Sequence, residues 1–406
     1  MKLLKVDTLE GGIEKLHKAY VEAQDTPETE NVLLVKALGR VLAEDIVSEE
    51  NIPVFNRSVV DGYAVKALET AGCSDSMPVF LEVVGEVEMG KPAPCKLASG
   101  QCMYVPTGGM IPEGADAVAM VEHCQPFGTN QMAIYSPLSY GKNMVFAGDD
   151  VALGQKVLEV GKTITPADMG LLASLGKTKI KVYKPWKVYI ISTGDEVVSP
   201  EDTPAEGQVR DVNTYGLIGE VQRFGFEVVG FELIKDDYKL LKTRAEAAKE
   251  TCDVVLISGG SSKGKKDATA QVIEDITGEI LTHGLAVKPG KPTILAFEKE
   301  SKTIYAGLPG HPVAALLLFR LVIGGLWNRL CIAKNRVPLK AKIAINLAAA
   351  PGRKTFQLVK LDGEWATPIL GKSGLIRTMS EADGYIILDV NDEGINKGEE
   401  VEVWLL

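Results

Sequence analysis

The sequence predicts a multidomain α/β protein whose largest unit is built around a parallel β-sheet. Three observations carry this prediction. Strand and helix patterns alternate over 186–334, short β-type runs broken by Gly and Pro fill 51–147, and β-type runs return from 335 onward. The expected domains are a mixed N-terminal connector, a β-rich insertion, an α/β domain and a small C-terminal β-barrel, with these limits: 1–50 with 148–185, 51–147, 186–334 and 335–406.

The charge of the chain limits the ligands that it can bind. Its 406 residues carry 44 Lys and Arg against 54 Asp and Glu, which gives a net charge of −10. An acidic protein has no general field for nucleic acid or for an anionic membrane, so we expect neither as a partner. Any anionic ligand must therefore be held by a local site.

The hydropathy pattern favours a cytoplasmic protein. The start of the chain turns acidic and Gly-rich before an apolar signal segment could form. The longest apolar stretch, 313–330, is interrupted by Arg320, so we expect a buried core helix there rather than a membrane span. Six cysteines without a C-x-x-C pair are too sparse for a disulfide scaffold, which favours a reducing compartment.

The connector is expected to contain two helices. Apolar residues within 6–20 recur at a spacing of three to four, which predicts an amphipathic helix with Asp7 or Thr8 as its cap. A second helix is expected to begin at Thr165, a good N-cap that is followed by Pro, and to end before Gly176. Between these helices, the insertion shows only short strand patterns.

The α/β domain is predicted from strands that are apolar without interruption. Helix patterns separate these strands and begin near Asn213, Tyr238, Asp267 and His311. Continuous apolar strands are typical of a parallel sheet that helices cover on both faces. Ligands of such sheets bind at the carboxyl ends of the strands, so we expect the functional site at that edge.

Three strands of this domain end in loops rich in Gly and hydroxyl side chains. The loops are S-T-G-D-E at 192–196, S-G-G-S-S at 258–262 and G-L-P-G-H-P at 307–312. Glycine lets backbone amides approach a ligand closely, and amides at loop-to-helix junctions favour an anion. One such loop would be an ordinary tight turn, but three at one sheet edge predict a ligand site.

Carboxylates at the same edge point to a divalent cation. Glu196 and Asp267 could hold Mg²⁺, which prefers oxygen ligands and usually arrives with a phosphate. Asp267 also stands where a helix N-cap would, and the two roles are compatible. Asp236 and Asp237 follow another strand, and a solvated loop explains them as well as a site does.

A lysine pair adds positive charge to this domain. Lys288 and Lys291 lie in K-P-G-K-P, where proline stiffens the chain, and two fixed ammonium groups suit an oxyanion clamp. Outside this domain, Asp61 and Thr107 are by local chemistry only turn residues. The sequence contains no P-loop, no G-x-G-x-x-G and no histidine cluster with zinc spacing.

Seven segments together resemble one family, the molybdopterin molybdenumtransferases (the MoeA and gephyrin E-domain group). They occur in order over essentially the whole chain: N-R-S-V-V-D-G-Y-A (56–64), P-T-G-G-M-I-P-E-G-A-D-A-V (106–118), G-D-D-V-A-L-G (148–154), S-T-G-D-E (192–196), S-G-G-S-S-K-G-K-K-D (258–267), K-P-G-K-P (288–292) and G-L-P-G-H-P-V (307–313). Several are weak singly, but the set is specific.

The resemblance implies a homodimer of four-domain subunits, in which a cleft separates the pterin-binding α/β domain from the β-domain of the second subunit. The family hydrolyses adenylated molybdopterin with Mg²⁺, inserts molybdenum from molybdate, and releases AMP and molybdenum cofactor. A molybdopterin adenylyltransferase and molybdoenzyme acceptors are the further partners that this activity implies.

The resemblance also implies a role for each matching residue. The catalytic residues would be Asp61, Thr107, Asp150, Glu196 and Asp267, and the metal ligands would be Glu196, Asp236, Asp237 and Asp267. The residues that contact the pterin substrate would be Ser258, Gly259, Gly260, Ser261, Pro309, Gly310 and Pro312. The residues that bind the oxyanion would be Lys288, Lys291, Pro292, Arg353 and Ser373.

This chain departs from the family pattern at a few positions. It has His311 and Ala314 where the family commonly reads L-P-G-N-P-V-S, and Asp211-Val212-Asn213 where D-S-N is usual. The preferred oxyanion, molybdate or tungstate, therefore stays open. Two other functions are the alternatives: molybdopterin adenylylation, which the additional domains disfavour, and a non-catalytic pterin-binding scaffold, which the retained carboxylates disfavour.

Overall fold

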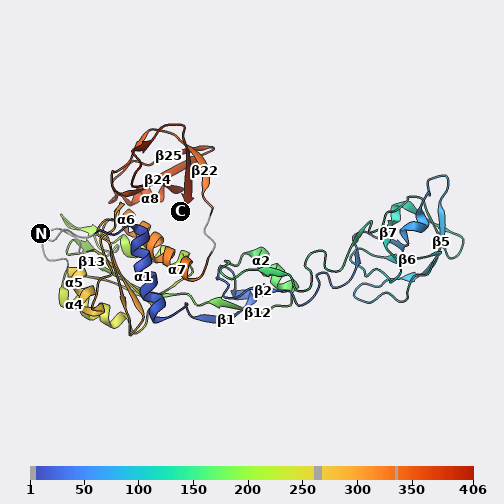
Figure 1. The fold of residues 1–406 in the computed structure, drawn as a ribbon, viewed down its shortest axis with the longest axis horizontal. Coiled ribbons are helices and arrows are strands. Elements are labelled where there is room, and N and C mark those ends of the chain that lie inside the picture. Colours follow the sequence, from blue (N-terminus) through green and yellow to red (C-terminus); the bar gives the residue numbers. More distant parts are fainter. Residues whose placement is uncertain (1–5, 260–267, 334–336) are drawn as a thin grey trace.

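The computed structural model describes residues 6–259, 268–333 and 337–406 and shows an elongated molecule (Figure 1). The α/β domain and the C-terminal domain lie together at one end, and the insertion with β5, β6 and β7 lies at the far end. The connector with β1, β12 and α2 lies between them. The multidomain α/β fold class is confirmed, whereas the residue limits of the domains stay a prediction.

The α/β domain contains a six-stranded sheet in the order β16-β13-β17-β21-β20-β18. Strands β16, β13, β17 and β21 are parallel, and β20 and β18 alternate in direction. The strands are β13 (Lys187–Thr193), β16 (Glu227–Ile234), β17 (Val254–Gly259), β18 (Thr282–His283), β20 (Ile294–Glu298) and β21 (Thr303–Leu308). Strand β20 is antiparallel because the turn over 299–302 is too short for a crossover.

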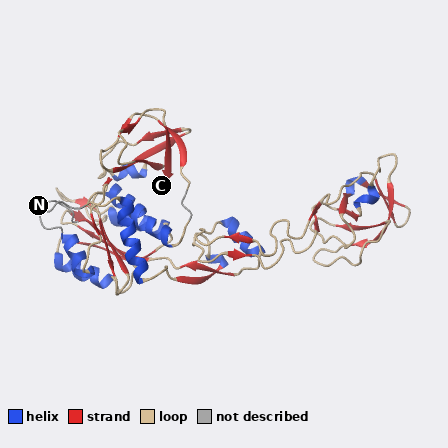
Figure 2. Cartoon of the chain, viewed as in Figure 1, coloured by secondary structure: helices blue, strands red, loops and turns tan. Residues whose placement is uncertain are grey.

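Helices cover both faces of this sheet (Figure 2). Alternate residues of β13 belong to different cores, with Val188 and Ile190 on one face and Ile191 on the other. The helices are α1 (Leu9–Ala23), α3 (Asn213–Arg223), α4 (Tyr238–Ala248), α5 (Ala268–Thr277), α6 (Pro312–Leu318) and α7 (Gly325–Leu330). Helix α1 begins after its cap Thr8, and its Leu16 and Tyr20 are buried in the core of the sheet domain rather than in the connector.

Helices α6 and α7 form one continuous helical segment through a π-helical stretch, η4 (Phe319–Gly324). Within the described residues, Pro312–Leu330 is long and apolar enough to cross a membrane, but 72% of its most apolar window is buried inside the fold. It is therefore a core helix, as the sequence predicts. Its Arg320 is largely buried and donates two hydrogen bonds, of 2.6 and 3.2 Å, to the Glu220 carboxylate of α3.

The connector has its own small core around Leu42, Ile164 and Leu172. It consists of α2 (Pro166–Ser174) and two antiparallel ladders, which pair β1 (Thr29–Leu33) with β12 (Lys179–Tyr183) and β2 (Ile46–Val47) with β11 (Lys156–Leu158). The Thr165 side chain accepts a hydrogen bond from the Asp168 N–H, and Asp168 accepts one in return, so the predicted cap is a complete capping box.

The insertion is a six-stranded sheet in the order β7-β4-β6-β5-β9-β8, with a hydrophobic core on either side. Its strands are β4 (Gly62–Val65), β5 (Val79–Glu86), β6 (Gln101–Val105), β7 (Ala117–Met120), β8 (Cys124–Phe127) and β9 (Gln131–Ile134). A short ladder of β3 (Arg57–Ser58) with β10 (Met144–Val145) accompanies it.

The C-terminal domain is the predicted barrel, because five of its strands pair in a closed ring, β24-β25-β22-β28-β26. They are β22 (Leu339–Ile343), β24 (Lys354–Asp362), β25 (Trp365–Pro368), β26 (Gly384–Leu388) and β28 (Glu400–Leu405). A short helix, α8 (Ile376–Ser380), lies between β25 and β26. One strand from the α/β domain, β19 (Val287–Lys288), adds to β24 from outside the ring.

The buried ion pair in α6–α7 gives a test of the core. We expect Arg320→Ala to lower the free energy of unfolding by about 3–5 kcal/mol, because the Glu220 carboxylate would remain buried without its partner. The matched control is Arg377→Ala, which removes an exposed pair with Glu381 and should change stability by about 0.5 kcal/mol or less. Similar losses in chemical denaturation of the two variants would contradict this assignment.

Candidate functional site

The register of the parallel strands brings the three Gly-rich loops together. Thr193 at the end of β13 lies opposite Ile234 of β16 and Gly259 of β17, and Ser258 lies opposite Leu308 of β21. The chain therefore leaves all four strands at one edge. This edge, called the sheet edge below, is where the sequence predicts the site.

The close approach of these loops requires glycine at residue 259. Its φ is +124°, and a Cβ atom there would lie 1.9 Å from the Thr193 carbonyl oxygen. A Cβ atom on Gly310 would lie 3.7 Å from the Gly259 Cα, so the loop after β21 approaches the end of β17 closely. Pro309 and Pro312 are buried on either side of Gly310.

Asn213 at the start of α3 joins two of these loops. Its amide nitrogen donates to the Ser258 hydroxyl at 2.8 Å and to the Gly310 carbonyl at 2.9 Å. The Gly310 carbonyl can only accept, so it fixes which way the amide faces, and the buried Asn213 Oδ1 has no partner among the described residues. From the sequence, Asn213 is expected as a helix start and as part of a variant motif, and it is not among the predicted site residues. Its place as the first helical residue behind the sheet edge is the signal that could have identified it.

The two adjacent carboxylates Asp236 and Asp237 have different partners in the structure. The Asp236 carboxylate accepts a 2.7 Å hydrogen bond from the Thr193 hydroxyl, which places it at the sheet edge. Asp237 is the N-cap of α4, where its carboxylate accepts from the Leu240 N–H at 2.8 Å. Asp237 is therefore occupied by helix capping, and Asp236 is the better candidate for the site.

The described residues do not complete a magnesium site. Glu196 is exposed, and a Cβ atom on Gly194 would lie 2.9 Å from its Oε2, so its carboxylate folds back over the first loop. Over 6–259, 268–333 and 337–406, no three His, Cys, Asp or Glu side chains converge as metal ligands would. The predicted residues Gly260, Ser261 and Asp267 lie outside the described residues.

Positively charged residues gather where the C-terminal barrel meets the α/β domain. Strand β19 pairs with β24 so that Lys288 lies opposite Thr355, and Arg353 immediately precedes β24. The 288–292 loop packs on α6, because a Cβ atom on Gly290 would lie 2.7 Å from the Leu318 side chain. Lys288, Lys291 and Arg353 are exposed and have no ion-pair partner within the described part of the chain.

Ser373 lies on the same junction and binds the third Gly-rich loop. The Ser373 carbonyl accepts a hydrogen bond from the Val313 N–H at 3.2 Å. The Ser373 hydroxyl lies 2.8 Å from Nδ1 of His311. We call the group of Lys288, Lys291, Pro292, Arg353, His311 and Ser373 the basic junction.

The predicted catalytic residues of the insertion form a pair of their own. Asp61 Oδ1 accepts hydrogen bonds from the Thr107 N–H at 2.7 Å and from the Thr107 hydroxyl at 3.1 Å. Both residues are exposed at strand ends of the insertion, at the opposite end of the molecule from β13 (Figure 1). The exposed Asp150 donates its N–H to the Ile52 carbonyl near the connector. A single chain therefore does not bring these three residues to the sheet edge.

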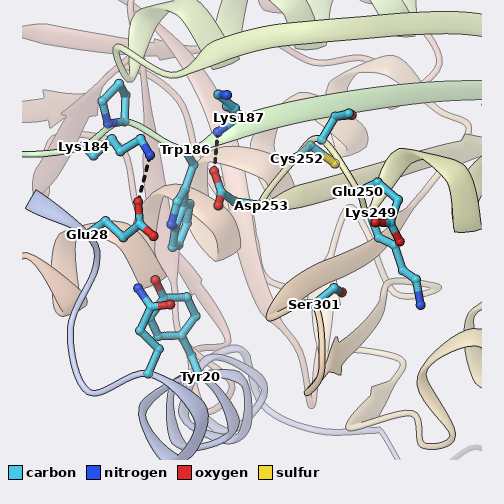
Figure 3. Close-up of a pocket in the computed structure, with 13 residues that line it drawn as sticks. Tyr20, Glu28, Lys184, Trp186, Lys187, Lys249, Glu250, Cys252, Asp253 and Ser301 are labelled. Atoms are coloured by element: carbon cyan, nitrogen blue, oxygen red, sulfur yellow. Dashed lines mark hydrogen bonds and ion pairs between the residues drawn. The ribbon is translucent and has the colours of Figure 1, made fainter.

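A polar cavity of about 280 Å³ lies at the other end of the same sheet (Figure 3). Its lining includes Lys187, the first residue of β13, whose N–H donates to the Asp253 carboxylate at 2.7 Å, and the Glu28–Lys184 ion pair. Desolvation raises the pKa of Asp253. This cavity lies where β13 and β17 begin, so it is separate from the sheet edge, where Ser258, Gly259 and Gly310 lie.

The six cysteines are all free thiols. Burial raises the pKa of Cys102, Cys124 and Cys252 to about 12, and burial also raises the pKa of Cys331 and Cys73. Cys95 is exposed in the insertion. Because a thiol with a raised pKa stays protonated at neutral pH, the buried cysteines lack the thiolate that covalent catalysis needs.

The comparisons with known proteins agree along the chain. Residues 189–327 match the family model described as "Probable molybdopterin binding domain", which defines the class of the α/β domain. Residues 10–176 match "MoeA N-terminal region (domain I and II)", and residues 340–406 match "MoeA C-terminal region (domain IV)". Taken with the sheet edge, these matches define a multidomain protein of molybdenum cofactor biosynthesis.

Relatives that match along almost their whole length identify the family. A molybdopterin biosynthesis protein of Methanocaldococcus jannaschii is 34% identical over 97% of this chain and 95% of its own length. The molybdopterin molybdenumtransferase of Haemophilus influenzae is 33% identical over 93% of both. A crystal structure of the MoeA protein of Pyrococcus horikoshii, 36% identical, covers 99% of both chains with a TM-score of 0.82. The chain belongs to the MoeA family of molybdopterin molybdenumtransferases.

The thiol environments predict selective alkylation. We expect iodoacetamide at about pH 8 to modify Cys95 first, because Cys102, Cys124 and Cys252 stay protonated, Cys102 and Cys252 are buried and Cys124 is partly buried. Peptide mass spectrometry of the native protein measures the site and the extent of modification. The same reaction in denaturant should modify all six cysteines. Rapid native labelling of Cys252 would contradict the described core.

Proposed function

We propose that this protein inserts molybdenum from molybdate into adenylated molybdopterin, hydrolyses the adenylate and releases AMP, in the cytoplasm. The observation that supports this most directly is the meeting of two sites of different chemistry. The sheet edge offers amides and hydroxyls, and the basic junction beside it offers cations that have no ion-pair partner among the described residues. A phosphate-bearing ligand and a small oxyanion therefore have neighbouring places to bind.

The sheet edge would bind the pterin and its phosphate. Ser258 Oγ accepts its hydrogen bond from Asn213, and its own proton has no acceptor among the described residues, so the hydroxyl could donate to a ligand oxygen. Gly259 has no side chain, so the end of β17 can lie close to the Thr193 carbonyl at this edge. The loop over 309–312 would close the other side of the pocket, where Asn213 holds Gly310 in place.

The basic junction would bind molybdate. A tetraoxo dianion accepts hydrogen bonds from ammonium and guanidinium groups, and Lys288, Lys291 and Arg353 supply both kinds of donor. Ser373 adds a hydroxyl from the barrel. The pocket would thus form only when the barrel is docked on the α/β domain through β19 and β24.

A second copy of the chain would complete the hydrolytic site. Asp61 and Thr107 lie at the far end of the molecule from the sheet edge of their own chain, so in a homodimer they would reach the sheet edge of the second copy. The Asp61 carboxylate would accept the proton of the water that attacks the adenylate phosphorus. The bond from that phosphorus to the bridging oxygen would break, so the products would be AMP and the phosphate of molybdopterin. Magnesium dependence stays a prediction, because the described carboxylates do not form a metal site.

The direct test is the release of AMP from adenylated molybdopterin with and without molybdate. Release that depends on molybdate supports the proposed transferase. Binding of adenylated molybdopterin without AMP release at any molybdate concentration would instead support a pterin-binding scaffold. Replacement of molybdate by tungstate in the same assay shows which oxyanion the basic junction prefers.

Asp61 gives the sharpest test of a shared site. Asp61→Asn keeps an oxygen that can accept from Thr107, so the fold and ligand binding should be retained. Loss of the carboxylate should lower the rate of AMP release by about 100-fold, because the interaction acts chiefly in the transition state. Quenched single-turnover reactions measure the rate of AMP release.

Mixed dimers decide whether Asp61 acts across the dimer. Dimers of one Asp61→Asn subunit and one Glu196→Ala subunit should recover activity, because one of their two clefts has both residues intact. Homodimers of each variant, folded by circular dichroism, are the controls. Purified mixed dimers that remain inactive would show that Asp61 does not act on the sheet edge of a second copy.

Lys291 tests the oxyanion site separately. We expect Lys291→Ala to raise the molybdate concentration for half-maximal AMP release by about tenfold, through loss of a charge-assisted hydrogen bond, with pterin binding unchanged. Lys299→Ala is the matched control, because Lys299 is an exposed lysine in the β20–β21 turn of the same domain. An unchanged molybdate requirement would place Lys291 outside the pocket.

A further inference from the structure

The contact between His311 and Ser373 joins the two halves of the basic junction. Nδ1 of His311, in the loop after β21, lies 2.8 Å from the Ser373 hydroxyl oxygen of the C-terminal domain. The Ser373 backbone is fixed next to it by the bond from the Val313 N–H to the Ser373 carbonyl. The imidazole also lies beside Gly374, where a Cβ atom would be 3.9 Å from its Cδ2. The position of the ring is therefore set from both domains.

The protonation state of this imidazole decides the direction of the hydrogen bond. When the neutral ring carries its proton on Nε2, Nδ1 is an acceptor and the Ser373 hydroxyl must donate to it. When the ring is an imidazolium, Nδ1 donates, Ser373 Oγ accepts, and the Ser373 proton becomes available to another acceptor. The neutral tautomer that carries its proton on Nδ1 also donates to Ser373 Oγ and leaves the Ser373 hydroxyl proton available, but this tautomer adds no positive charge.

The charged groups near His311 indicate that the acceptor of the Ser373 hydroxyl proton would be an anion. Lys372 precedes Ser373, and the β19–β24 pairing of the same two domains carries Lys288, Lys291 and Arg353, which have no ion-pair partner among the described residues. On the packed elements, Lys354 is paired with Glu10, Arg377 with Glu381, and Arg320 with Glu220. Asp211 precedes α3, and its carboxylate accepts a hydrogen bond from the Thr214 N–H. A dianion bound at this junction would interact favourably with a positive charge on the His311 ring.

We propose that His311 is a positioning residue that switches the Ser373 hydroxyl, and that its protonation strengthens oxyanion binding at the basic junction. The inference rests on the proposed function, since it takes molybdate or tungstate as the oxyanion. Protonation acts twice in the same direction: it adds a cation beside the pocket, and it releases the Ser373 proton for an oxyanion oxygen. By linkage, oxyanion binding favours the imidazolium to the same extent.

Each variant that tests this switch removes one property of the His311–Ser373 pair. His311→Asn keeps a polar side chain but cannot titrate, and Ser373→Ala removes the hydroxyl and leaves the imidazole. His17→Asn is the matched control, because His17 lies on α1 and is not part of the basic junction. Thermal unfolding of each variant shows whether the fold is retained.

The first measurement is equilibrium dialysis of micromolar molybdate and tungstate at about pH 6.5 and about pH 8, across the range in which histidine titrates. The native protein and His17→Asn should bind about fivefold or more tightly at the lower pH. His311→Asn should bind equally at both, and Ser373→Ala should lose most affinity at the lower pH. Equal affinity of the native protein at both pH values, or full pH dependence in His311→Asn, would overturn the proposal.

The second measurement observes the ring itself. With only four histidines in the chain, ¹⁵N imidazole NMR can assign His311 by comparison with His311→Asn. Addition of molybdate at about pH 7 should shift His311 toward the imidazolium, and Ser373→Ala should reduce that shift. A His311 signal that does not respond to saturating molybdate would also overturn the switch. Both measurements are independent of AMP release, so absence of turnover in the native protein would count against the proposed function alone.

Discussion

The register of four parallel strands is the constraint on which the rest of this molecule depends. It makes β13, β16, β17 and β21 end at one edge, so loops that are far apart in sequence become neighbours. The approach is close enough that Gly259 has no room for a side chain. Asn213 then ties Ser258 to Gly310 across the loops. The sheet edge is thus a consequence of strand pairing, and its polar groups are set in place before a ligand arrives.

A second pairing extends this edge into another domain. Strand β19 leaves the α/β domain and adds to β24 of the barrel, which carries Arg353 to the vicinity of Lys288. The contact of His311 with Ser373 closes the same junction through side chains. Because cations from separate domains repel one another, this arrangement is held by backbone pairing and apolar packing, and a bound anion would relieve its charge.

The elongated shape separates chemistry that the family resemblance assigns to one site. The Asp61–Thr107 pair is well formed, yet it lies in the insertion, with the connector between it and the sheet edge. The connector has its own core, around Leu172, and it holds the insertion away from the α/β domain. A two-fold arrangement of such chains is the geometry that brings unlike ends together, and this supports the proposal of a shared site.

The sequence by itself determined the features that depend on local patterns. Apolar runs predicted the sheet and its covering helices, Thr165 predicted a helix start, and whole-chain motifs predicted the family. The tertiary structure decided which of two adjacent aspartates lies at the sheet edge, because only the position of Thr193 across the sheet selects Asp236. It also decided that His311 contacts Ser373, since strand register and domain docking set distances between residues that no local pattern relates.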